Sequence, residues 1–325
     1  MPRLVPTDVA TFTGGRTALV TGGAGFIASH LVNRLIVDGW NVTIVDNLRT
    51  GKRENVDDRA TFYEMDLLSP ELAQVFEQRR PNVVFHLAAQ ASVTQSMADP
   101  VEDARINVVG TLNLLQACGE WPVDHFAFTS TGGALYGEAG TEPRAEDHPV
   151  KPISVYGASK YAAEGYLRVL AEAAGFPYTV LRPGNVFGPR QDPTGEAGVV
   201  AIFAKQMLAG EPVTVFGDGT QERDYIYVDD IVEANIRAVN SDSTDGSRAF
   251  NIGTGIRTNV LRIFELLAEA TGYSTPPVHA PKRTGEVQRI YLDAGKAHRE
   301  LGWKPMVSIG DGIRRTVDAM RKESS

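Results

Sequence analysis

The chain has 325 residues, and its apolar fraction of 42% and charged fraction of 22% are ordinary for a soluble globular protein. A formal net charge of −8 argues against a nucleic-acid or anionic-membrane surface, and a single cysteine, Cys118, excludes an internal disulfide. The six histidines and Cys118 lack zinc-ligand spacing, so we expect no metal site.

The segment 1–15 lacks the basic and apolar regions of a secretory signal. No apolar run approaches the roughly 20 residues that a membrane-spanning helix needs. A cytoplasmic, soluble protein is therefore expected.

Strand and helix patterns alternate along the first half of the chain. Short apolar runs predict six strands, at 17–21, 41–46, 61–65, 82–86, 125–129 and 178–181. Helices are predicted at 24–38, from a cap at Ser69 to about 79, at 103–118 and at 153–174. This alternation predicts an α/β fold with a doubly wound parallel sheet of the Rossmann type.

After Arg182 the pattern changes to shorter strands separated by glycine- and proline-rich segments. Further helices are expected near 199–208, 260–270 and 309–320, while a helix at 228–238 and a strand at 249–252 could return to the first sheet. We predict a dinucleotide-binding domain over 15–184 plus 224–257, and a smaller mixed α/β lobe over 185–223 plus 258–325.

A glycine turn joins the first strand to the first helix. Gly22 permits the tight turn and Gly25 lets backbone amides approach a pyrophosphate, although Ala28 replaces the usual third glycine. Asp46 lies 24 residues after Gly22 at a strand end, where a carboxylate bonds the adenosine ribose and repels a 2′-phosphate. NAD is therefore favoured over NADP, with nearby Arg49 leaving NADP open.

The alternative is a purely structural glycine turn. Residues after the third and fourth strands argue against it, because ligands bind at the carboxyl ends of strands in open sheets. The cofactor-binding residues predicted on these grounds are Gly22, Gly25, Phe26, Ile27, Asp46, Asn47, Asp66, Leu67, Leu87, Ala88, Ala89 and Gln90.

Tyr156 and Lys160 lie four residues apart, so on one helix their heads project to the same side. A neighbouring ammonium favours the phenolate form of a tyrosine. Beside a nicotinamide ring, such a phenolate could take a hydroxyl proton while a carbon-bound hydride leaves.

Together these segments resemble the extended short-chain dehydrogenase/reductase superfamily, and within it the UDP-glucose 4-epimerases and their relatives. The resemblance runs from Thr21 to about Trp303. Its most specific segments are 21–30, 86–90, 130–137, 156–160, 182–193 and 217–230.

The resemblance implies roles for the residues around the reacting carbon. Tyr156 is the base, Lys160 also binds the nicotinamide ribose, and Pro183 and Val186 lie near the nicotinamide. Counting back from Tyr156, Thr131 matches the family's active-site hydroxyl, and Ser130 is the competing candidate.

The segment 130–137 also distinguishes epimerisation from dehydration. Nucleotide-sugar dehydratases of this superfamily carry an acidic pair there, because elimination of water needs general acid–base groups. This chain has Gly132 and Gly133 instead. Dehydration is therefore not expected.

The resemblance also implies a nucleotide-sugar site in the smaller lobe. Arginine suits the diphosphate because its planar guanidinium binds phosphate oxygens in pairs. The implied residues are Asn185, Arg223 and Arg283 at the diphosphate, Val199 and Val200 at the uracil-binding helix, Phe216 at the base, Glu286 at the ribose and Ile290 near the hexose C2 group.

The expected activity is reversible 4-epimerisation of a UDP-hexose, UDP-glucose and UDP-galactose above all, with NAD as cofactor and a 4-keto intermediate. The alternatives are a UDP-glucuronate or UDP-N-acetylhexosamine 4-epimerase, or a net oxidoreductase. Asp192 argues against UDP-glucuronate, since it stands where some uronate-acting relatives have arginine. A catalytically idle NAD-binding scaffold is the different-class alternative.

The helices at 103–118 and 153–174 carry substantial apolar surface. Relatives pair these helices across a two-fold axis, so the resemblance implies a homodimer.

Overall fold

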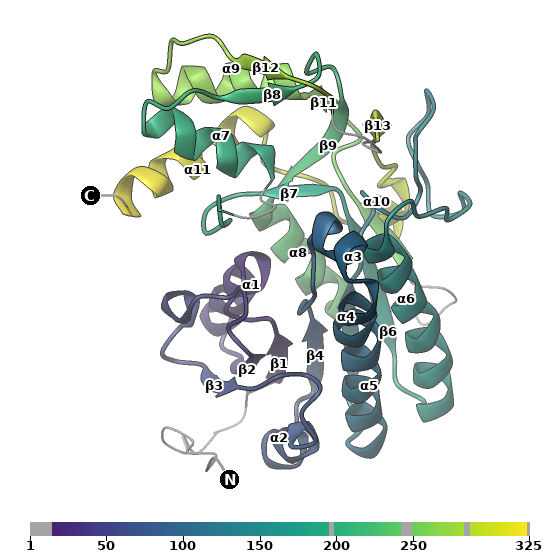
Figure 1. The fold of residues 1–325 in the computed structure, drawn as a ribbon. Helices are drawn as coiled ribbons and strands as arrows, with labels where there is room; N and C mark the ends of the chain where they lie inside the picture. The colour runs from purple at the N-terminus through teal and green to yellow at the C-terminus, as the bar shows by residue number, and fades with distance from the viewer. Residues whose placement is uncertain (1–14, 195–197, 242–248, 283–286, 324–325) are drawn as a thin grey trace. The chain divides into compact units, whose positions relative to one another are not determined.

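The computed structural model describes residues 15–194, 198–241, 249–282 and 287–323 (Figure 1). The described chain forms two compact units. The first holds residues up to 130, 154–180 and 238–241, and the second holds 131–153, 181–237 and 249–323.

The first unit is built on a parallel sheet. Its strands are β1 (Thr17–Thr21), β2 (Asn41–Asp46), β3 (Thr61–Glu64), β4 (Val83–His86), β5 (His125–Thr129) and β6 (Tyr178–Pro183). The sheet order is β10-β6-β5-β4-β1-β2-β3, and the neighbouring pairs from β5 to β3 are parallel. The chain winds outward from β1 through β2 to β3, then returns to β4 on the other side. This reversal creates a switch point at the carboxyl ends of β1 and β4.

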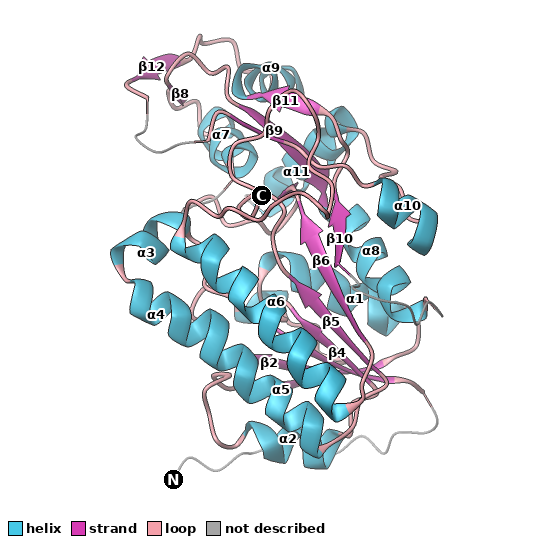
Figure 2. Ribbon diagram, turned by 90° about the vertical axis from the view of Figure 1, so that its right-hand side faces the viewer, coloured by secondary structure: helices cyan, strands magenta, loops and turns pink. Residues whose placement is uncertain are grey.

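Helices cover both faces of this sheet. They are α1 (Phe26–Val37), α2 (Leu72–Arg79), α3 (Val93–Ala98), α4 (Pro100–Ala104), α5 (Gly110–Glu120) and α6 (Val155–Ala174), with a short 3₁₀ turn, η1 (Arg53–Asn55). Figure 2 shows α4, α5 and α6 side by side in front of β4 and β5, and Figure 1 shows α1 on the other side. The prediction of a doubly wound Rossmann-like sheet is confirmed.

Two details of the predicted helices were wrong. The expected helix at 103–118 begins earlier, at Pro100, and contains a π-helical segment, η2 (Arg105–Val109), between α4 and α5. Ser69 is not the cap of α2: that helix begins after Glu71, and Ser69 lies one turn outside it.

The second unit is mixed, and it contains short strands and several helices. The strands are β7 (Asn185–Phe187), β8 (Thr214–Phe216), β9 (Glu222–Tyr227), β10 (Ala249–Ile252), β11 (Arg257–Asn259), β12 (Val278–Ala280) and β13 (Arg289–Ile290). The helices are α7 (Val199–Leu208), α8 (Val228–Asn240), α9 (Val260–Thr271), α10 (Gly295–Leu301) and α11 (Ile309–Glu323).

Strand β9 is the centre of this lobe, because β11, β13 and β7 all pair with it. Strands β8 and β12 form a separate two-stranded sheet. Strand β10 instead extends the seven-stranded sheet beside β6, as predicted for 249–252.

Within the described residues, every helix is too short or too polar to cross a bilayer. The same residues hold no group of three or more His, Cys, Asp or Glu side chains arranged for a metal ion.

Candidate active site

The glycine turn after β1 is fixed by backbone packing. Gly22 has a φ of +72°, and a Cβ placed on it would lie 2.9 Å from the backbone nitrogen of Ala88 in the loop after β4. A side chain is therefore excluded there twice, by conformation and by space. Gly25 precedes α1 and offers no side chain to cap its first amides. Those amides are suited to the oxygens of a pyrophosphate.

Asp46 ends β2 beside this turn. Its Oδ2 accepts a hydrogen bond from the amide of Ala24 at 3.0 Å, and its Oδ1 accepts one from Leu48 at 2.8 Å. The carboxylate is thus held next to the turn. Arg49 is engaged elsewhere, since its Nη1 lies 2.7 Å from Oε1 of Glu102. This ion pair weakens the sequence argument for NADP.

The other predicted cofactor residues at strand ends are tied together. Asn47 donates to Oδ2 of Asp66 at 2.7 Å, and Leu67 packs against Gly110 at the start of α5. After β4, the amide of Ala88 donates to Oγ1 of Thr21 at 3.2 Å. The loop of Leu87, Ala88, Ala89 and Gln90 therefore lies against the glycine turn. Phe26 and Ile27 open α1 after that turn.

Asn107 fixes the end of that loop. Its Oδ1 accepts from the amide of Gln90 at 2.9 Å, and its Nδ2 donates to the Gln90 carbonyl at 2.9 Å. The same Nδ2 reaches Oγ of Ser159 on α6 at 3.1 Å. The π-helical segment carries Asn107, and such segments recur at functional sites.

Helix α6 presents Tyr156 and Lys160 in its first turns. Ser154 caps the helix by accepting from the amide of Gly157, and the Tyr156 amide donates to Oγ of Ser96 at 3.1 Å. Lys160 is buried, with its Nζ 4.2 Å from the centre of the Phe128 ring.

Burial lowers the pKa of Lys160 to about 7, while the carboxylates of Glu164 and Asp103 oppose that shift. His86 also lies near Lys160. Burial, and then the charge of Lys160, holds the pKa of His86 well below its usual value. His86 is therefore neutral, with its ring nitrogens bonded to Thr21 and Thr111 at 2.8 Å.

The two candidate hydroxyls belong to different units. Ser130, in the first unit, is buried, and its Oγ has no hydrogen-bond partner among the described residues. Thr131 opens the second unit and is also buried. Neither position excludes a working hydroxyl, so the choice of Thr131 over Ser130 stays a prediction.

The glycine pair after Thr131 has a steric basis. The amide of Gly132 donates to the carbonyl of Pro183 at 2.7 Å, and a Cβ there would lie 2.5 Å from Cδ1 of Leu292. An acidic side chain has no room at that position. Gly133 has its nearest neighbour, Oδ1 of Asn185, at 3.6 Å.

The predicted substrate residues of the second unit lie on several elements. Pro183 ends β6, Asn185 and Val186 are on β7, Val199 and Val200 open α7, and Phe216 ends β8. Arg223 is on β9, with Nη1 donating to the Glu222 carbonyl at 2.9 Å, and β13 places Ile290 beside it. Ile290 is buried against Leu135 and Tyr136. Arg283 and Glu286 lie outside the described residues.

The model of the NAD-dependent epimerase/dehydratase family matches residues 18–253. The chain belongs to this family. The UDP-glucose 4-epimerase of Mycolicibacterium smegmatis is 42% identical over 311 residues, covering 94% of this chain and 99% of that protein.

Two solved structures of the family are also similar. The UDP-glucose 4-epimerase of Thermotoga maritima with UDP-glucose is 50% identical, with a TM-score of 0.92 over 95% of this chain and 100% of that one. The UDP-glucose 4-epimerase of Thermus thermophilus in complex with NAD is 45% identical, with a TM-score of 0.88 over 94% of this chain and 99% of that one. The resemblance to the extended short-chain dehydrogenase/reductases is confirmed.

The residues present fit the family's cofactor. The turn at Gly22 leaves a cradle that any Cβ would fill, and Asp46 places a carboxylate beside it. These two observations suit the pyrophosphate and the unphosphorylated ribose of NAD.

Three buried polar residues near Lys160 were missed from the sequence. They are Asp103, Asn107 and Glu164. The signal was present in the spacing, because Asp103 and Asn107 lie four residues apart on one helix and Glu164 lies four residues after Lys160.

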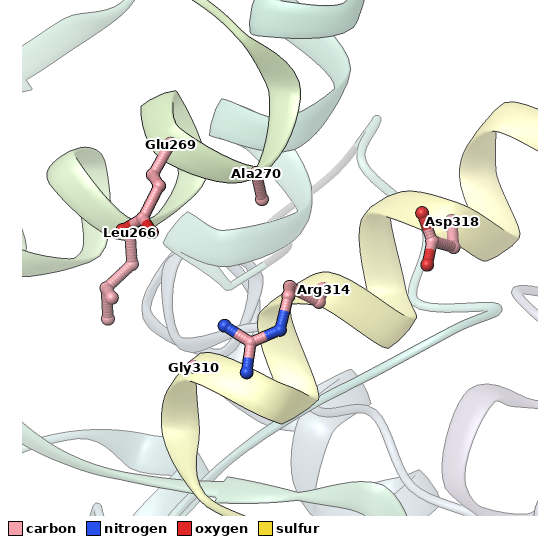
Figure 3. Close-up of a pocket in the computed structure, with 6 residues that line it drawn as sticks. All are labelled: Leu266, Glu269, Ala270, Gly310, Arg314 and Asp318. Carbon is pink, nitrogen blue, oxygen red and sulfur yellow. The ribbon is translucent and has the colours of Figure 1, made fainter.

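A hollow of about 240 Å³ lies between α9 and α11 of the second unit (Figure 3). Its lining residues are Leu266, Glu269, Ala270, Gly310, Arg314 and Asp318, none of which is a predicted site residue. Arg314 pairs with Asp311, and Asp318 pairs with Arg321. These charges are accounted for within α11.

Proposed function

We propose that this protein catalyses reversible, NAD-dependent 4-epimerisation of a UDP-hexose, with UDP-glucose and UDP-galactose as its substrates. The observation that carries the proposal is the buried Lys160 one turn after Tyr156. Hydrogen bonds of Asn107 link their helix to the loop that lies beside the glycine turn. The family and its UDP-glucose 4-epimerase relatives support the proposal.

The first step removes a proton and a hydride from the sugar. Tyr156, as phenolate, takes the proton of the 4-hydroxyl, and the ammonium of Lys160 stabilises the phenolate. Bound NAD supplies the hydride acceptor and later the hydride donor. Thr131, or Ser130 in its place, hydrogen-bonds the 4-oxygen. The 4-keto sugar then rotates within the site, so that the opposite face of C4 is reduced. Tyr156 returns the proton to the 4-oxygen.

Binding is divided between two parts of the chain. We assign NAD to 15–184 plus 224–257 and the nucleotide sugar to 185–223 plus 258–325. In this assignment Asn185, Arg223 and Arg283 hold the diphosphate, and Glu286 holds the ribose. Pro183 and Val186 lie at the nicotinamide, Val199, Val200 and Phe216 at uracil, and Ile290 near C2.

A nucleotide-sugar panel followed by product separation tests this function. We expect UDP-glucose and UDP-galactose to interconvert without added reductant. Preference for UDP-glucuronate or a UDP-N-acetylhexosamine would keep the 4-epimerase function but assign it a different substrate. Stoichiometric formation of NADH would show a net oxidoreductase. Bound cofactor with no turnover of any nucleotide sugar would show an idle scaffold.

We also propose a homodimer formed through the helices of the first unit. Large apolar side chains are exposed on α3, α4, η2 and α6: Val93, Met97, Val101, Val109, Tyr161, Tyr166 and Val169. So many on neighbouring helices suit an interface rather than solvent. The cytoplasmic location expected from the sequence remains a prediction, which cell fractionation would check.

A further inference from the structure

Helix α4 carries a buried carboxylate. Asp103, on α4, is only 1% exposed. Its Oδ1 accepts hydrogen bonds from Nε2 of Gln90 at 2.8 Å and from Nδ2 of Asn107 at 3.2 Å. Its Oδ2 has no hydrogen-bond partner among the described residues. A buried carboxylate with an unbonded oxygen is costly, so its charge calls for compensation nearby.

Lys160 is the buried cation on which this carboxylate acts. It is 2% exposed, and Asp103 and Glu164 are the carboxylates that act on it, from α4 and from the next turn of α6. His86 faces it from β4 but is neutral. The face of the Phe128 ring adds a weaker attraction for the ammonium.

We propose that Asp103 is a positioning residue of the epimerase reaction, whose buried negative charge favours the ammonium form of Lys160 while its hydrogen bonds hold the loop after β4. The proposal rests on the proposed function, in which Lys160 must be charged to stabilise the Tyr156 phenolate. Without the two carboxylates, burial alone favours the neutral amine, which stabilises no phenolate.

The hydrogen bonds of Asp103 lead directly to the reacting residues. Asn107, oriented by Asp103, donates to Ser159, and Ser159 donates to the Tyr156 carbonyl at 3.0 Å. Gln90, bonded to the same oxygen of Asp103, also donates to the carbonyl of Ser92 at 2.9 Å. One carboxylate therefore orients both the cofactor-side loop and the first turns of α6.

Asp103→Asn separates charge from hydrogen bonding. The amide oxygen can accept both bonds of Oδ1, and the NH₂ group replaces the unbonded Oδ2. The protein as purified, labelled with ¹³C-lysine and assigned with Lys160→Met, gives the titration midpoint of Lys160 by NMR. We expect Asp103→Asn to move this midpoint to lower pH by about one unit. The alkaline limb of the kcat profile should move in the same direction.

Further variants separate the two parts of the proposal. Glu164→Gln should lower the midpoint without disturbing Gln90 or Asn107. Asn107→Ser keeps the charge and breaks the bonds, so it should reduce kcat and leave the midpoint in place. Thr316→Val removes a buried hydrogen bond from α11 and should move neither quantity.

An unchanged Lys160 midpoint in folded Asp103→Asn overturns the proposal. A shifted midpoint with an unmoved kcat profile overturns its catalytic part. If Asp103→Asn does not fold, Asp103→Ser is measured in the same way and judged by the same midpoint. The midpoint does not depend on turnover, so a wild-type protein that epimerises no UDP-hexose would refute the proposed function alone.

Discussion

Tyr156 and Tyr161 lie on the same helix in different surroundings. Tyr161 is 45% exposed, whereas Tyr156 is half-buried and lies one turn before the buried Lys160. Tyr156→Phe removes the proposed base, and we expect kcat for UDP-galactose to fall by roughly 10²–10⁴-fold with bound NAD retained. Tyr161→Phe is the matched control and should keep full activity. Comparable turnover by the two variants would rule out the assignment of the base.

Gly132 and Gly133 are neighbours with opposite tolerance for a side chain. A Cβ at Gly132 meets Leu292 at 2.5 Å and the Arg182 carbonyl at 2.8 Å, but at Gly133 nothing lies closer than 3.6 Å. We expect Gly132→Ala to lower the free energy of unfolding by about 1–3 kcal/mol. Gly133→Ala should change it by less than about 0.5 kcal/mol. Urea denaturation of both variants checks this, and equal stabilities would contradict the packing seen.

Lys160 makes stability depend on pH. Its pKa falls from 10.5 to about 7 on folding, so between these values the unfolded chain binds a proton that the folded chain does not. Stability contributed by this group therefore rises with pH through that window, by at most about 1.4 kcal/mol per pH unit. Below about pH 7 the cost of the buried charge is fully present.

Lys160→Met removes this titration. We expect the difference in unfolding free energy between the native protein and the variant to shift in favour of the native protein as pH rises from 7 to 10. Other groups titrate in both proteins and cancel in the comparison. Urea unfolding at several pH values measures the difference, and a constant value would contradict a lowered pKa at Lys160.

At the scale of elements, we expect the end of β2 to select NAD over NADP. Asp46 is held by two backbone amides beside the glycine turn, and Arg49 is paired with Glu102. Asp46→Ala should weaken NAD binding roughly tenfold, the loss of about 1.4 kcal/mol. It should also narrow the preference for NAD over NADP, because the repelling charge is gone. Calorimetric titration of cofactor-depleted protein with both cofactors measures this, and an unchanged ratio would argue against Asp46.

Several strands and one helix were predictable because their sequence patterns are local. β1, β2, β5 and α7 have the bounds expected from apolar runs between glycine, proline and polar breaks. The start of α2 was not predicted correctly, because a turn follows Ser69 and the helix begins only at Leu72. Helix α3 was missed since its six residues are too few to show a periodicity.

The candidate site residues also differ in whether local sequence or tertiary contacts reveal them. The glycine turn, Asp46, Tyr156 and Lys160 stand in motifs with fixed spacing, so the sequence alone singled them out. The carboxylate of Asp103 and the bonds of Asn107 depend on tertiary contacts between α4, α6 and the loop after β4. The π-helical segment that carries Asn107 has no signature in hydrophobic period.

At the scale of the whole molecule, the proposed dimer gives a direct test. Val169 on α6 is 52% exposed among the other apolar residues of that face. A charge there would be buried on association, so Val169→Asp should shift the native dimer to monomer in size-exclusion chromatography with light scattering. Val37→Asp, on α1 and 73% exposed, is the control and should leave the dimer intact. A native monomer would refute the proposal.

The π-helical segment Arg105–Val109 has a consequence for how chain length can vary in this protein. A single π turn holds one residue more than an α turn, so a deletion there closes the helix and keeps the faces on either side in phase. Leu114 and Leu115 would stay in the core. A deletion elsewhere would rotate the following residues by about 100°. We therefore expect this segment to tolerate loss of one residue structurally while the side-chain bridge to Gln90 and Ser159 disappears. The hydrogen bonds that link Gln90 to Ser159 through Asn107 thus depend on one additional residue that the packing of the core does not require.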